Sequence, residues 1–182
     1  SNIVNRGSDN LFANDGNDAV SATSGNNNNI ERVDYVATGG LSSPNLDKVG
    51  FLILERNGND PFGIAPITDI DASGEPTSYG DFISVVSGDW NDSGEGINTN
   101  VLRDTDTTDG TRPTQTAYVT GQTINTVFFT YNDLGITNGE EFFGYSLFPG
   151  DVDKTNNDLI DLTDFPTDTQ SGDGGLDLLA SG

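Results

Sequence analysis

The sequence feature that most constrains the fold is a series of short apolar runs, each separated from the next by turn-forming residues. The runs are rich in Val, Ile, Phe, Tyr and Thr, and pairs such as Asn-Gly, Asp-Gly and Ser-Gly lie between them. Because β-branched and aromatic residues favour strands and these pairs favour tight turns, the pattern is typical of antiparallel β structure. It predicts strands at residues 30–37, 48–56, 63–70, 80–86, 98–103, 115–120, 124–131 and 141–148.

The spacing of these runs favours a single all-β domain. In the run at 141–148, apolar side chains occupy both alternating sets of positions, which predicts a central strand that is covered on both faces. A chain of 182 residues is long enough to bury one core. We therefore expect an antiparallel β-sandwich, jelly-roll-like, at 30–182, and an extended polar arm at 1–29. The closing segment 176–180 is expected to pair as an edge strand, with its own sheet or with a neighbouring copy's sheet.

The acidic charge is carried almost entirely by Asp. The net charge is −22, and 23 of the 29 acidic residues are Asp. Asp bonds to nearby backbone groups and favours turns, so most acids should lie in loops and helices should be few. A surface this negative repels nucleic-acid phosphates and anionic lipids, and no segment approaches the roughly 20 apolar residues of a membrane span. We therefore expect cations as partners, and neither nucleic acid nor membrane insertion.

The chain lacks the side chains most often used in catalysis. It contains no His, Cys or Met, which excludes imidazole bases, thiolate nucleophiles and the usual zinc or copper ligands. A pair of carboxylates, as in glycoside hydrolases, is the remaining route. Glu140 and Glu141 are adjacent and would point to opposite faces of a strand, and the other Glu residues are scattered at Glu31, Glu55, Glu75 and Glu95. We therefore expect no enzymatic activity.

A short repeat lies in the polar arm. The sequence GSDNL at 7–11 recurs nine residues later as GNDAV at 16–20. This repeat resembles the calcium-binding nonapeptides of bacterial RTX proteins, in which Asp oxygens bind calcium and the apolar residue packs inward. The resemblance implies Asp9 and Asp18 as calcium ligands. The alternative is an extended arm whose apolar side chains, such as Phe12, fill a groove of a neighbouring copy.

Three further acidic loops resemble calcium-binding loops, in which alternate oxygens face the ion and Gly turns the chain. They lie at 89–94, 104–110 and 151–158, and the last resembles the end of a dockerin calcium loop. Carboxylates gathered in one loop repel each other, and a hard divalent cation relieves this repulsion. Ordinary solvated turns are the alternative for each loop. We expect structural Ca²⁺ in at least one of them, with ligands among Asp89, Asn91, Ser93, Asp104, Asp106, Asp109, Asp151, Asp153 and Asp158.

Three longer segments point to a location outside the cell. The sequences ERVDYV at 31–36, VGFLILERNGNDPF at 49–62 and GEEFFGYSLFPGDV at 139–152 resemble secreted bacterial surface and adhesin-type β proteins of unknown role. We therefore expect a non-enzymatic extracellular surface protein, a self-assembling subunit of a fibre, sheath or layer that exchanges a terminal strand with the next copy. The alternative is a calcium-dependent carbohydrate-binding or adhesin domain that grips a glycan with Trp90, provided that this side chain is exposed and not folded onto the core.

Overall fold

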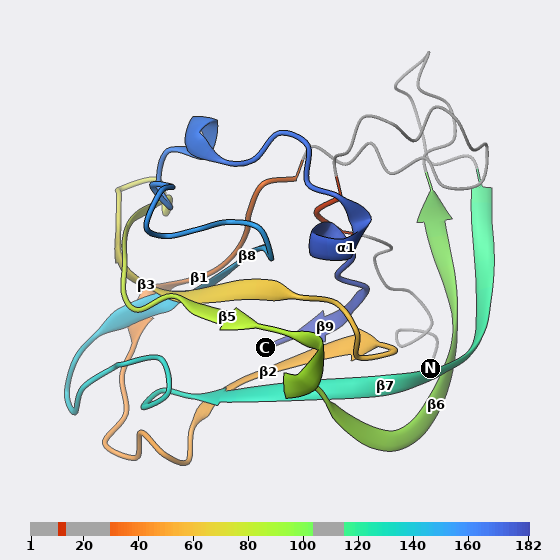
Figure 1. The fold of residues 1–182 in the computed structure, drawn as a ribbon. Helices are drawn as coiled ribbons and strands as arrows, with labels where there is room; N and C mark the ends of the chain where they lie inside the picture. The colour runs from red at the N-terminus through yellow and green to blue at the C-terminus, as the bar shows by residue number, and fades with distance from the viewer. Residues whose placement is uncertain (1–10, 14–29, 104–114) are drawn as a thin grey trace.

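Two antiparallel sheets pack face to face in the computed structural model, which describes residues 11–13, 30–103 and 115–182 (Figure 1). The predicted all-β sandwich is therefore confirmed. Helical structure in the described residues consists of three short segments, η3 (Ser87–Asp89), η4 (Leu162–Asp164) and α1 (Ser171–Gly174). Within the same ranges, no helix combines the length and the apolar character needed to cross a membrane.

The first sheet has β8 in its interior, as the apolar pattern at 141–148 predicts. Its order is β1-β8-β3-β4, and β5 also pairs with β3. Gly144 of β8 has φ of +108°, and a Cβ there would lie 1.9 Å from the carbonyl oxygen of Tyr35 in β1. Only Gly fits this close approach. The strand bounds are β1 (Val33–Leu41), β3 (Phe62–Ile70), β4 (Pro76–Tyr79), β5 (Ile83–Val85) and β8 (Phe142–Pro149).

The second sheet has the order β6-β7-β2-β9, and it corrects two sequence expectations. A single strand, β7, replaces the two strands predicted at 115–120 and 124–131, because the chain passes through Gly121 at φ of +71° without leaving the sheet. The strand predicted at 98–103 is longer and starts within the expected loop at 89–94. The bounds are β2 (Gly50–Arg56), β6 (Asn91–Arg103), β7 (Gln115–Thr130) and β9 (Leu178–Ser181).

The main core lies between the two sheets. Phe51 of β2 stands in its middle, with its ring centroid 4.3 Å from that of Tyr145 and 6.1 Å from that of Phe142, both in β8. A smaller cluster covers the opposite face of β8 and consists of Ala65, Phe148, Val152, Leu159 and Phe165. Since burial of apolar surface stabilises a fold by about 25 cal/mol per Å², both faces of β8 contribute to stability.

The two ends of the described chain lie against each other. We call residues 11–13 the N-terminal anchor. The backbone N–H of Leu11 donates to the carbonyl of Leu176 at 3.1 Å, and that of Phe12 donates to Gly174 at 3.0 Å. The following segment forms β9, which pairs with β2 of its own sheet. This part of the expected polar arm is therefore packed against the sandwich, close to the C-terminal strand.

Candidate metal centre

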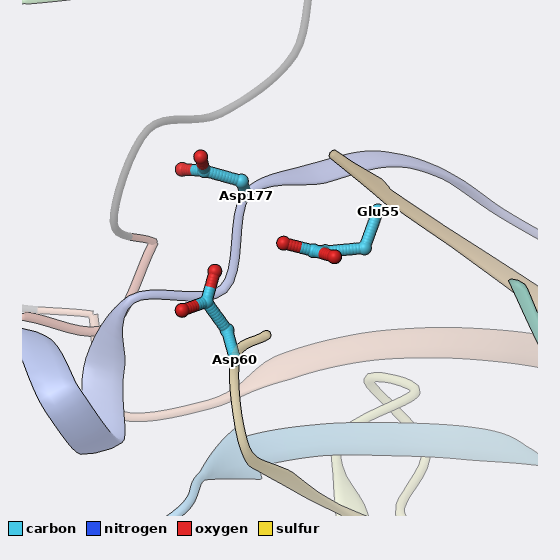
Figure 2. A group of neighbouring side chains, drawn as sticks. All are labelled: Glu55, Asp60 and Asp177. Atoms are coloured by element: carbon cyan, nitrogen blue, oxygen red, sulfur yellow. The ribbon is translucent and has the colours of Figure 1, made fainter. Parts of the chain in front are cut away.

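Three carboxylates from separate segments meet at one end of the second sheet. Glu55 lies near the end of β2, Asp60 lies in the connection from β2 to β3, and Asp177 directly precedes β9. One oxygen of each lies within 4.8 Å of the others, and Figure 2 shows the three side chains around a common space. We call them the carboxylate cluster. Among the described residues, no other group of three acidic side chains is as close.

A tight turn after β2 brings two of these acids together. Asn57 and Gly58 have φ of +77° and +66°, a conformation that Asn and Gly adopt most readily. The backbone N–H of Gly58 donates to Oε2 of Glu55, which fixes one oxygen of that carboxyl group. Beyond the turn, the backbone carbonyl of Asp60 accepts a hydrogen bond from the indole Nε1 of Trp90 at 2.9 Å. The Asn-Gly pair that the sequence marks as a turn thus places Asp60 beside Glu55.

Arg56 holds the third acid in place. Its Nη2 lies 2.8 Å from Oδ2 of Asp177, and its backbone N–H donates to the carbonyl of the same residue at 3.2 Å. Its Nη1 donates to Oγ1 of Thr99 at 3.2 Å. The Arg56 side chain is 1% exposed and that of Asp177 is 16% exposed. The cluster is therefore buried on the Arg56 side and reaches solvent through Asp177.

The Glu55 carboxyl group has a strongly perturbed pKa. Its side chain has no solvent exposure, and no donor among the described residues bonds to its Oε1. Burial raises the pKa of Glu55 to about 9, and a side-chain hydrogen bond with Asp60 and the negative charges of Asp60 and Asp177 act in the same direction. The hydrogen bond from the backbone N–H of Gly58 lowers the pKa of Glu55. An ionised carboxylate here needs a positive partner that the described side chains do not supply at Oε1.

The acids predicted at 89–94 have local backbone partners. Oδ2 of Asp89 accepts from the backbone N–H of Val86 at 2.8 Å. Asn91 and Ser93 lie in β6, where their side chains donate to carbonyl groups of β7 at 3.4 and 2.7 Å. These hydrogen bonds stabilise the turn at η3 and the pairing of β6 with β7.

The three acids predicted at 151–158 do not have oxygens that all lie within 4.8 Å of one another. Asp151 accepts from the hydroxyl of Thr169 at 3.2 Å, and burial raises its pKa. Asp153 accepts from the backbone N–H of Thr155 at 2.8 Å, which lowers its pKa. Asp158 accepts from the N–H two residues further on, at 2.9 Å. The remaining predicted ligands lie outside the described residues: Asp9, Asp18, Asp104, Asp106 and Asp109.

Sequence reasoning missed the carboxylate cluster. In the sequence Glu55 is one of several scattered acids, and neither Asp60 nor Asp177 lies in a segment that resembles a calcium loop. The stretch ERNGND at 55–60 does carry a signal, since it places two acids on either side of a predicted turn. Asp177 joins them only through the pairing of β9 with β2, which no local pattern encodes.

Trp90 is anchored to the core. Its ring centroid lies 5.4 Å from that of Phe62, and its Nε1 bonds to the carbonyl of Asp60. The sequence allows the Trp90 side chain to be either exposed or folded onto the core. In the structure it is folded onto the core.

The carboxylate cluster offers hard oxygen ligands next to one guanidinium group. Such a ligand set suits a hard cation in preference to a soft one. Comparison of the chain with models of known protein families, with curated proteins and with solved structures found no match.

Proposed function

We propose that this protein is a non-enzymatic structural protein of the extracellular bacterial surface, and that its copies assemble into a fibre, sheath or layer by exchanging the N-terminal anchor. The docking of the anchor carries this proposal. Phe12 and Ala13 are 1% and 0% exposed, so two side chains of the predominantly polar N-terminal arm are buried against the β-sandwich. The Asp-rich composition and the resemblance to secreted surface proteins support the extracellular location.

The anchor fits a defined receptor on the C-terminal segment. A Cβ on Gly174 would lie 2.6 Å from the backbone nitrogen of Ala13, so this glycine leaves room for the anchor backbone. Phe12 packs in the main core beside Leu176. Two backbone hydrogen bonds and one aromatic side chain form a small, self-contained interface of the kind used when a segment is added to another protein.

The length of chain after the anchor is sufficient for exchange between copies. Residues 14–29 separate the anchor from the sandwich. Sixteen residues span at most about 55 Å when extended, and a body of this size is about 40 Å across. The anchor of one copy can therefore occupy the receptor of the next with the same contacts that it makes within its own copy. Repetition of this exchange in one direction gives a linear polymer.

Two complementary variants test the proposal. Phe12→Asp disables the anchor and leaves the receptor intact, whereas Gly174→Val blocks the receptor and leaves the anchor intact. We expect the wild type to form polymers that grow with concentration, each variant alone to remain monomeric, and an equimolar mixture to stop at dimers. Light scattering after gel filtration and electron microscopy of negatively stained samples measure these states.

Gly172→Ala is the matched control, because a Cβ at Gly172 meets nothing within 4 Å. This control should polymerise as the wild type does. Circular dichroism of each variant checks that the β-sandwich is retained. A wild type that stays monomeric at every concentration would contradict the proposal, as would polymers of either disabled variant that match those of the wild type.

A further inference from the structure

The three carboxyl groups of the cluster are close enough together for one calcium ion to contact all of them. Oxygens of Glu55, Asp60 and Asp177 all lie within 4.8 Å of one another. Calcium binds oxygen at about 2.4 Å, so two ligands on opposite sides of one ion are about 4.8 Å apart. A single ion in the space between the three side chains can therefore contact all of them.

An independent observation points to a ligand in this space. Oε1 of Glu55 is fully buried and accepts no hydrogen bond from the described residues. In Figure 2 the Glu55 carboxyl group points from β2 into the space between Asp60 and Asp177. Buried polar atoms are nearly always satisfied, and an atom without a partner calls for a bound water or ion. A cation beside Oε1 would supply that partner.

The local charge calls for a divalent cation. When all three carboxyl groups of the cluster are ionised, they carry three negative charges, and in the described part of the chain the Arg56 guanidinium beside Asp177 offsets one of them. Burial of that charge is costly unless it is compensated. Asp177 is 16% exposed, so an ion has access from solvent, and water can complete the six to eight ligands that calcium takes.

We propose that Glu55, Asp60 and Asp177 bind one Ca²⁺, which ties the turn after β2 to the segment before β9. This site differs from the acidic loops that resemble calcium loops in the sequence, because its ligands come from three segments and are partly buried. The proposal does not depend on assembly of the protein, since all three ligands belong to one copy.

The test uses the chelator-treated protein as a monomer at low concentration. We expect Ca²⁺ at about 100 times its Kd to raise the melting temperature by about 5 to 10 °C. Mg²⁺ at the same concentration should give a smaller rise, because it demands a near-octahedral site. Tb³⁺ should bind in place of Ca²⁺ and show emission excited through Trp90, the one Trp in the chain, whose indole bonds to the backbone of Asp60.

The Glu55→Gln variant tests whether Glu55 binds calcium or only stabilises the fold. The substitution keeps the shape of the side chain and prevents its ionisation, so the metal-free variant should melt at or above the temperature of the metal-free wild type. The calcium-induced rise and the Tb³⁺ emission should both be lost. Asp153→Asn, in an exposed loop, is the control and should retain both signals.

Three outcomes would overturn the assignment. One is a wild type whose melting temperature does not respond to Ca²⁺. The second is a Glu55→Gln variant that keeps the response, or an Asp153→Asn variant that loses it. The third is an equal rise with Mg²⁺, which would contradict the choice of calcium.

Discussion

The carboxylate cluster and the exposed loop at 151–164 are both rich in acid, yet their carboxylates have opposite environments. In the loop, Asp153 accepts a hydrogen bond from the backbone N–H of Thr155, and Asp161 accepts from the hydroxyl and the backbone N–H of Thr163. These bonds lower the pKa values of both acids. In the cluster, burial raises the pKa of Glu55. An exposed acid is thus satisfied by its own turn, whereas a buried acid among other acids needs a partner from elsewhere. The density of Asp along the chain does not distinguish the two situations.

Removal of Arg56, the cation that the described residues place at the cluster, should have the largest effect. Arg56→Ala removes the guanidinium group that pairs with Asp177. Loss of one partner of a buried ion pair costs about 3–5 kcal/mol. We expect a loss of this size in the free energy of unfolding of the metal-free protein, measured by urea denaturation. Lys48→Ala, at an exposed position, is the control and should change stability little. If Lys48→Ala lowered the free energy of unfolding as much as Arg56→Ala, the buried charge would contribute no more to stability than the exposed one.

A pH titration of the metal-free protein should show the next largest effect. The pKa of Glu55 rises from 4.5 to about 9 on folding, so between these values the folded protein holds a proton that the unfolded chain has released. The resulting stability is fully present below pH 4.5 and is lost as the pH rises through about 9. We expect stability in chelator to fall from pH 6 to pH 8, by at most about 1.4 kcal/mol per pH unit.

Glu55→Gln provides the control for this titration. The variant has no proton to lose, so its unfolding midpoint in urea should depend much less on pH over the same interval. The chain has no His, so few other groups titrate there. A slope that is the same in wild type and variant would show that the pH dependence arises elsewhere.

The smallest effect is expected in the exposed loop. Asp161 caps η4 and accepts hydrogen bonds from the backbone N–H and the hydroxyl of Thr163, at 3.0 and 2.7 Å. Asp161→Ala removes the cap of one short turn in solvent, so we expect a loss of stability much smaller than that of Arg56→Ala. Addition of Ca²⁺ should stabilise this variant as much as it stabilises the wild type. If Ca²⁺ did not stabilise the Asp161→Ala variant, this would indicate that the metal site lies in the loop and not at the carboxylate cluster.

The strands were predictable wherever a local pattern determines them. The apolar residues on both faces at 141–148 correctly predict a central strand, and Asn57 with Gly58 correctly predict a turn. The pattern failed at Gly121, because a glycine with positive φ can bend a strand without ending it. The candidate site could not be predicted in the same way, since Asp177 reaches Glu55 only through the pairing of β9 with β2.

The contact between the N-terminal anchor and the C-terminal segment has a mechanical consequence. The anchor bonds to the carbonyls of Gly174 and Leu176, and the next residue, Asp177, bonds to Arg56 in β2. A pull on the anchor is therefore transmitted along 174–177 into β2, an interior strand of the second sheet, and not to an exposed edge. In a chain of copies joined through their anchors, tension would pass from one copy to the next through this short segment. The strength of the whole assembly would then be set by the few bonds around Arg56 and Asp177.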